Sequence, residues 1–81
     1  MIHKRILMVC LGNICRSPLA EGILKAKVNS DFIHVDSAGT SAFHRGELPD
    51  KRSIDIARKH DIDIINQRSR QFIAADFEIF D

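Results

Sequence analysis

The stretch RILMVCLGNICRSPLAEG, residues 5–22, constrains the fold more than any other part of the chain. Its residues 6–9 are an unbroken apolar run between charged residues and a Gly-Asn turn, which is typical of a parallel strand buried on both faces. Ser17 followed by Pro18 predicts a helix N-cap and the first helical residue, and the apolar residues after them follow helical spacing. The stretch therefore predicts a strand, a short loop that begins at Cys10, and a helix.

A second strand is predicted after this helix. Residues 32–35, Phe-Ile-His-Val, favour a strand, and the Asp-Ser-Ala-Gly-Thr that follows them favours its end. A strand, a helix and a second strand in this order predict a right-handed βαβ unit. The expected fold class is therefore α/β with a parallel sheet.

The pattern beyond the second strand is less regular. After a loop, Asp50 is expected to cap a second helix. Residues 68–76 are expected to form a short helix, and residues 76–81 resemble the approach to another strand. No repeat or linker divides the chain, so residues 1–81 are expected to form a single domain.

Composition excludes several classes of protein. The chain is 44% hydrophobic and 28% charged with a net charge of +1, which indicates an ordinary globular protein. Dispersed basic residues and five aromatic residues, all Phe, argue against a nucleic-acid surface. No apolar run approaches the roughly 20 residues of a transmembrane helix, and the first residues lack the features of a secretory signal. A cytoplasmic protein with no membrane partner is expected.

The loop that begins at Cys10 has the pattern C-x5-R and ends at Arg16. A loop of this length between a strand and a helix can turn its backbone N–H groups inward at the positive end of the helix dipole, where they bind a tetrahedral anion such as phosphate or sulfate. Gly12 offers conformational freedom, Asn13 tolerates left-handed geometry, and an arginine binds two phosphate oxygens at once. The residues expected to contribute this anion site are Leu11, Gly12, Asn13, Ile14, Cys15 and Arg16.

Cys10 is the candidate nucleophile of this site. A cysteine near a helix N-terminus and an arginine has a pKa of roughly 3.5–7.5, compared with about 8.5 for a free cysteine. A hydrogen bond from Ser17 would further favour the thiolate. The expected chemistry is attack on a phosphate ester, which gives a cysteinyl-phosphate that water hydrolyses. The alternative is that Cys10 is a small buried apolar residue at the end of a strand.

The segment VCLGNICRSPLAEG resembles the signature loop of the low-molecular-weight protein tyrosine phosphatases, and the resemblance continues through DSAGT, PDKRS, KHDIDI and SRQF. It implies the N-terminal βαβα part of a four-stranded parallel sheet with helices on both faces, the phosphotyrosine phosphatase I-like fold. It also implies a phosphotyrosine protein or a small aryl phosphate as substrate, and no metal or cofactor. The implied roles are nucleophile for Cys10, phosphate clamp for Arg16, and loop shaping and thiolate stabilisation for Asn13 and Ser17.

The resemblance implies roles for four further residues. Cys15 matches a second loop cysteine that pairs with the nucleophile under oxidation and so shields it. Phe43 and His44 match residues at the mouth of the site, where Phe43 is expected to stack on the phenyl ring, unless it packs inward as a loop anchor. His60 matches a histidine that bonds the loop asparagine, but a helix C-cap is an equal alternative for it.

The chain also departs from the family pattern. Family members are nearly twice as long, and their general acid is the Asp of an Asp-Pro pair, which this chain lacks; Asp81 is not a substitute. Because general acid catalysis contributes about 10²–10⁴-fold, little activity is expected on poor leaving groups. We therefore expect a truncated phosphatase domain, with an exposed sheet edge that favours association with another copy.

Two other functions fit parts of the sequence, and a third is disfavoured. Thiol-dependent arsenate reductases share C-x5-R, but Leu11, Ile14 and Pro18 match the phosphatase pattern and the downstream cysteine pair of the reductases is absent. A second alternative is an oxyanion-binding module without turnover. Zinc binding is disfavoured because the four histidines are scattered and the two cysteines are not paired as in structural zinc sites.

Overall fold

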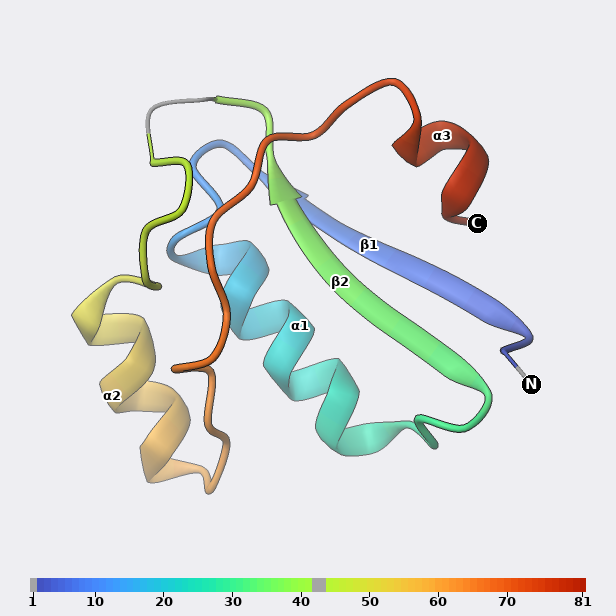
Figure 1. The fold of residues 1–81 in the computed structure, drawn as a ribbon. Coiled ribbons are helices and arrows are strands. Elements are labelled where there is room, and N and C mark those ends of the chain that lie inside the picture. The colour runs from blue at the N-terminus through green and yellow to red at the C-terminus, as the bar shows by residue number, and fades with distance from the viewer. Residues whose placement is uncertain (1, 42–43) are drawn as a thin grey trace.

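Two parallel strands form the sheet in the computed structural model, which describes residues 2–41 and 44–81. Strand β1 (Lys4–Cys10) pairs with strand β2 (Ile33–Gly39) so that Lys4 lies opposite Ile33 and Cys10 lies opposite Gly39. Helix α1 (Arg16–Lys27) is the crossover between them (Figure 1). This arrangement confirms the predicted βαβ unit and places Cys10 at the carboxyl end of its strand.

Helix α1 begins at Arg16, and Cys15 occupies its N-cap position without a side-chain cap bond. The prediction that Ser17 is the N-cap is therefore wrong. Its hydroxyl group instead lies 3.0 Å from the Cys10 sulfur and accepts a hydrogen bond from the Asn13 side chain. The side chain that resembled a cap thus lies in the first turn of the helix and contacts the loop before it.

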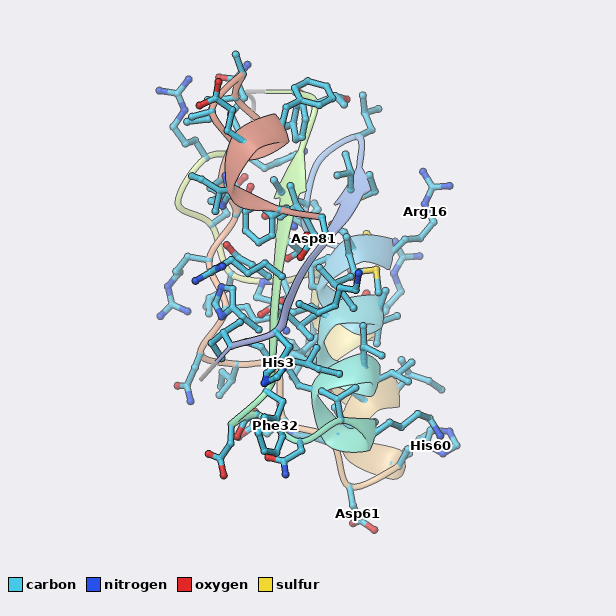
Figure 2. The ribbon with its side chains drawn as sticks, turned by 90° about the vertical axis from the view of Figure 1, so that its right-hand side faces the viewer. His3, Arg16, Phe32, His60, Asp61 and Asp81 are labelled. Carbon is cyan, nitrogen blue, oxygen red and sulfur yellow. The ribbon has the colours of Figure 1, made fainter. Side chains whose placement is uncertain are left out.

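Helix α2 (Lys51–Lys59) is capped as predicted. The Asp50 carboxylate accepts a hydrogen bond of 2.9 Å from the backbone N–H of Arg52. His60 occupies the C-cap position, and its side chain lies at the end of the molecule away from Arg16 (Figure 2). Of the two alternatives for His60, the structure therefore confirms the C-cap.

The predicted helix over residues 68–76 is wrong. The chain is extended in this region, and Gln71 forms an isolated parallel bridge with Gly39 at the end of β2. The backbone N–H of Gly39 bonds the oxygen of Arg70 at 2.8 Å, and the N–H of Phe72 bonds the oxygen of Gly39 at 2.6 Å. Hydrogen bonds to a strand that is distant in sequence thus replace the local bonds of a helix.

Most of the stretch 76–81, which the sequence predicts to approach another strand, is helical. Helix α3 (Asp76–Ile79) occupies most of this stretch, and the Asp76 carboxylate accepts a bond of 2.8 Å from the N–H of Ile73. Beyond the helix, the N–H of Asp81 bonds the carbonyl oxygen of Arg5 at 2.7 Å. Asp81 therefore lies beside the edge of β1 that does not face β2.

Helices lie on both faces of the sheet. Side chains alternate along β2, so Ser37 faces α1, whereas His34 and Asp36 face the opposite side. There His34 stacks on Phe80 and Asp36 accepts a bond from Arg70. Figure 2 shows α1 and α3 on opposite sides of the strands.

The fully buried apolar side chains are few and lie mainly between the sheet, α1 and α2. Val9 is 47% exposed, so the prediction that β1 is buried on both faces does not hold for this strand. Across the described ranges, no helix is both long and apolar enough to cross a membrane. The buried apolar residues are Val35, Ala38, Ala57 and Ile64.

Candidate active site

The loop of residues 11–15 turns through a left-handed residue. Asn13 has a φ of +57°, whereas Gly12 is not among the described residues with positive φ. The freedom expected of Gly12 is therefore not used in this way. Instead, a Cβ at Gly12 would lie 3.0 Å from the imidazole carbon Cδ2 of His44, so the absence of a side chain lets His44 pack against the loop.

The end of β2 packs against the backbone of the loop. A Cβ at Gly39 would lie 2.8 Å from the carbonyl oxygen of Leu11 and 3.0 Å from the backbone nitrogen of Asn13. The N–H of Thr40 donates to the carbonyl oxygen of Cys10 at 2.9 Å. Only glycine lets the backbone of the strand approach the loop this closely.

The side chain of Asn13 holds the loop from inside. It is 2% exposed, and its amide nitrogen donates to the hydroxyl groups of Ser17 at 2.7 Å and Ser37 at 2.9 Å. Its amide oxygen accepts a bond of 3.0 Å from the backbone N–H of Arg70. Both the nitrogen and the oxygen of the Asn13 amide are therefore hydrogen-bonded, and none of these three bonds involves His60. The hypothesis that His60 bonds the loop asparagine is wrong.

The sulfur of Cys10 is surrounded by hydrogen-bond donors. The Ser17 hydroxyl lies 3.0 Å away and the backbone N–H of Asn13 lies 3.2 Å away. Burial by itself raises the pKa of the Cys10 thiol, but the Ser17 hydroxyl and the backbone N–H groups of Ser17, Asn13 and Gly12 together outweigh it and lower the pKa. The thiolate is the form that these donors favour.

Cys10 opens onto a cavity of about 670 Å³ at the start of α1. Arg16 lies at its rim, and its exposed side chain extends into solvent (Figure 2). On the other side, the imidazole of His44 pairs with the carboxylate of Glu47 at 2.5 Å. Within the described ranges, no three acidic, histidine or cysteine side chains gather into a possible metal site. The residues around the cavity are Cys10, Leu11, Gly12, Ile14, Cys15, Arg16, Ser41, His44 and Glu47.

The structure thus brings most of the sequence-predicted residues to one cavity. Asn13 and Ser17 are exceptions because they lie buried behind Cys10, and Phe43 lies outside the described residues. Cys10 and Cys15 are both free thiols.

Sequence reasoning missed two buried polar residues behind the loop. Ser37 is 4% exposed and Glu21 is 4% exposed, and the Ser37 hydroxyl donates to the Glu21 carboxylate. A signal was present, since Glu21 lies one helical turn after Ser17 and therefore shares its buried face. Glu47 was also missed, although it follows His44 by three residues in the same loop.

The comparison with known proteins agrees with this geometry. The sequence profile of the family described as low molecular weight phosphotyrosine protein phosphatase matches residues 5–81. The chain belongs to this family. A phosphatase of that description from Dictyostelium discoideum is 42% identical over 95 residues, which cover 98% of this chain and 53% of the relative. The chain spans about half the length of the curated relatives it matches.

Solved phosphatase structures have the same fold. A low molecular weight protein tyrosine phosphatase from Streptococcus pyogenes matches with a TM-score of 0.91 and 38% identity, over 96% of this chain and 53% of that one. Vibrio vulnificus Wzb in complex with benzylphosphonate matches with a TM-score of 0.88 and 33% identity, over 96% of this chain and 54% of that one. These matches confirm the α/β phosphatase fold and favour a phosphatase over the arsenate reductase alternative. The third and fourth strands of the sheet remain a prediction.

Proposed function

We propose that the protein hydrolyses phosphate monoesters of the phosphotyrosine class, with Cys10 as the nucleophile. One observation carries the proposal: Cys10 lines an open cavity, and the Ser17 hydroxyl and the loop N–H groups lower the pKa of its thiol. Membership of the phosphatase family supports the substrate class. The benzylphosphonate named with the Vibrio vulnificus structure is a phosphate-like aryl ligand of the same kind.

The reaction has two displacement steps. In the first, the thiolate of Cys10 attacks phosphorus, so that an S–P bond forms while the P–O bond to the leaving group breaks. In the second, water attacks the same phosphorus, the S–P bond breaks, and inorganic phosphate leaves with the thiolate restored. The backbone N–H groups of the loop and the positive end of α1 stabilise the phosphoryl oxygens.

Arg16 is proposed to bind two of those oxygens. Its position at the start of α1 puts a guanidinium at the rim of the cavity, and a planar guanidinium matches two oxygens of a phosphate. Leu11, which is 67% exposed at the same rim, offers apolar contact to an aromatic leaving group. We assign the stacking role to Phe43 and a place at the mouth to His44, which lines the cavity.

The leaving group is expected to govern the rate. The sequence contains no Asp-Pro pair, the motif that carries the general acid in the proposed class of enzyme. Without a proton donor, a poor leaving group loses about 10²–10⁴-fold in rate. The 81 residues are therefore proposed to act mainly on activated aryl phosphates.

A burst assay with para-nitrophenyl phosphate tests the proposal. The expected result is a burst of nitrophenolate, at most one equivalent per chain, that is absent in Cys10→Ser. An Arg16→Met variant is expected to weaken substrate binding by roughly tenfold or more, because it lacks the paired donors. Phosphate binding without any burst would replace the proposal with the second candidate, an oxyanion-binding module. Absence of both would reject both.

We also propose that the chain associates with a second copy. Among the described residues, apolar side chains of β1 and α3 are exposed, and Phe77 reaches 78%. Burying such a surface is favourable by about 25 cal/mol per Å². Sedimentation velocity between about 5 and 200 μM is expected to show a larger species that grows with concentration, and Phe77→Ser is expected to weaken it. A monomer at every concentration would contradict this.

We also propose a cytoplasmic location, because of the two free cysteines. Cys10 and Cys15 lie five residues apart and are both free, and thiols that act as nucleophiles persist in a reducing compartment.

A further inference from the structure

A chain of buried hydrogen bonds leads from Cys10 to a carboxylate on α1. The Cys10 sulfur contacts the Ser17 hydroxyl, both Ser17 and Ser37 accept from the amide of Asn13, and Ser37 donates to Glu21 at 2.5 Å. All four residues behind Cys10 are between 2% and 4% exposed. The proposed reaction uses Cys10 and Ser17 and gives Glu21 no role.

The direction of each bond in this chain can be worked out from the Glu21 end. An ionised carboxylate has no hydrogen to donate, so the Ser37 hydroxyl must donate its only hydrogen to Glu21. The oxygen of Ser37 is then free to accept, and one N–H of the Asn13 amide donates to it at 2.9 Å. The second N–H of that amide donates to Ser17 at 2.7 Å.

The orientation of the amide is fixed from a second side. The Asn13 oxygen accepts the backbone N–H of Arg70, a group that can only donate, so the amide nitrogen must face the two serines. Ser17 therefore receives a hydrogen from Asn13, and its own hydrogen points at the remaining neighbour, the sulfur of Cys10.

We propose that Glu21 is a positioning residue for the nucleophile: its buried carboxylate takes the Ser37 hydrogen, so that the Ser37 oxygen, together with the N–H of Arg70, holds the Asn13 amide where it donates to Ser17 and leaves the Ser17 hydrogen for the thiolate. This inference rests on the proposed role of Cys10. Glu21 touches neither substrate nor sulfur, and it acts only through the residues between them.

Charged groups near Glu21 and near Cys10 also influence the pKa of the Cys10 thiol. Lys25, one turn along α1, donates to the second oxygen of Glu21 at 2.5 Å. Loss of the negative charge of Glu21 would by itself favour the Cys10 thiolate and lower its pKa, because like charges repel. Loss of the hold on the Asn13 amide would weaken the bond from Ser17 to Cys10 and raise that pKa, so the two effects have opposite signs. The other titratable groups are Asp36, Asp63 and Arg68 around the cavity beside Glu21, and Cys15, Arg16, His44 and Glu47 around the cavity of Cys10.

Glu21→Gln is the informative substitution because Lys25 can only donate. Its ammonium will take the amide oxygen of the new side chain, which turns the NH₂ group toward Ser37. Ser37 then faces two donors and has no acceptor for its own hydrogen. The Ser37 oxygen is then held less firmly as an acceptor for the Asn13 amide, which is left positioned by Arg70 alone, and the hydrogen bond from Ser17 to Cys10 is weakened.

The experiment measures the pH dependence of alkylation of Cys10 by iodoacetamide in the whole 81-residue chain. Fragment ions of the tryptic peptide of residues 6–16 distinguish Cys10 from Cys15. In Glu21→Gln, the midpoint of the profile is expected to rise by roughly half to one pH unit. Lys25→Met, which leaves the bond between Ser37 and Glu21 in place, is expected to keep the wild-type midpoint.

The double variant Glu21→Gln/Lys25→Met separates positioning from loosened packing. Without the ammonium, the amide oxygen is free to face Ser37, so the midpoint is expected to return toward the wild-type value. An unchanged or lower midpoint in Glu21→Gln overturns the inference, as does an equal rise in the double variant. If Glu21→Gln does not fold by circular dichroism, Ser37→Ala replaces it: a raised midpoint supports the inference and an unchanged one overturns it.

Alkylation requires a thiolate but no turnover, so the two proposals fail separately. A chain that shows the alkylation shift without a burst keeps the role of Glu21 and rejects hydrolysis by Cys10. A chain with a burst but no alkylation shift keeps hydrolysis by Cys10 and rejects the role of Glu21.

Discussion

Cys10 shows how a single side chain acquires reactivity from the atoms around it. Burial opposes ionisation of its thiol, yet the pKa is lowered because the Ser17 hydroxyl and three backbone N–H groups point at the sulfur. Donors that favour an anion are also suited to the oxygens of a phosphate. The same local field thus suits both a thiolate at Cys10 and the oxygens of a phosphate.

Replacing Ser17 by Ala is expected to raise the pKa of Cys10 by roughly one unit, since the thiolate loses its side-chain donor. The folded pKa of Cys10 lies below its ordinary value, so its contribution to stability is present above the unfolded pKa and is lost as pH falls through the folded pKa. Urea unfolding at pH 6 and pH 9 measures the effect: the free energy of unfolding is expected to increase less from pH 6 to pH 9 in Ser17→Ala than in the wild type. Ser30→Ala, in an exposed turn, serves as the control, and an equal gain in both variants would contradict the prediction.

At the scale of elements, the shape of the loop of residues 11–15 depends on a strand that does not contain it. β1 and α1 supply its two ends, but the end of β2 lies directly beneath it, with Gly39 opposite Cys10 in the sheet register. Parallel pairing brings the carboxyl ends of both strands to the same edge. The loop is therefore shaped by β2 as much as by its own sequence.

Gly39→Ala is expected to displace the loop, because the new Cβ would lie 2.8 Å from the oxygen of Leu11, a backbone atom that cannot turn aside. The free energy of unfolding is expected to fall by about 1–3 kcal/mol. The burst with para-nitrophenyl phosphate is expected to fall by about tenfold or more. Gly46→Ala is the matched control: its φ of +80° strains an alanine, yet nothing lies within 4 Å, so it should lose stability and keep the burst. Equal losses of burst in both would contradict this.

For the whole molecule, Arg70 joins parts of the chain that are far apart. Its guanidinium bonds Asp36 of β2 at 3.2 Å and Asp76 of α3 at 3.1 Å, and its backbone N–H bonds the loop residue Asn13. The hydrogen bond from Arg70 is the main cause that lowers the pKa of Asp76, helped by the N–H of Ile73. One residue thus links the sheet, the last helix and the loop of residues 11–15.

Acid is therefore expected to weaken the fold through Asp76. Its folded pKa lies below the ordinary value of 3.8, so its contribution to stability is complete above that value and is lost as pH falls through the folded pKa. Asp76→Asn is expected to lower the melting temperature at pH 7 by roughly 5–10 °C. Thermal unfolding is followed by circular dichroism from pH 7 to pH 2.5. The melting temperature should fall less over this range in the variant than in the wild type. Asp61→Asn, in an exposed turn, is the comparison, and parallel curves for both variants would refute the prediction.

The sequence by itself determined the features that depend on neighbours along the chain. An apolar run, a C-x5-R loop and a helical pattern were enough to predict the βαβ unit, the cap at Asp50 and a site around Cys10. Local hydrogen bonding and side-chain periodicity act over a few residues, so a single sequence carries them. The resemblance to the phosphatase family rests on the same local motifs.

Only the tertiary structure decided what depends on distant partners. Residues 68–76 favour a helix locally, but the bridge between Gln71 and Gly39 keeps residues 68–73 out of a helix. Glu21 reads as an ordinary polar helix residue until β2 brings Ser37 against it. The energy of a hydrogen bond or of burial depends on the atoms that face each other across the fold, and a pattern of neighbours in sequence does not specify those atoms.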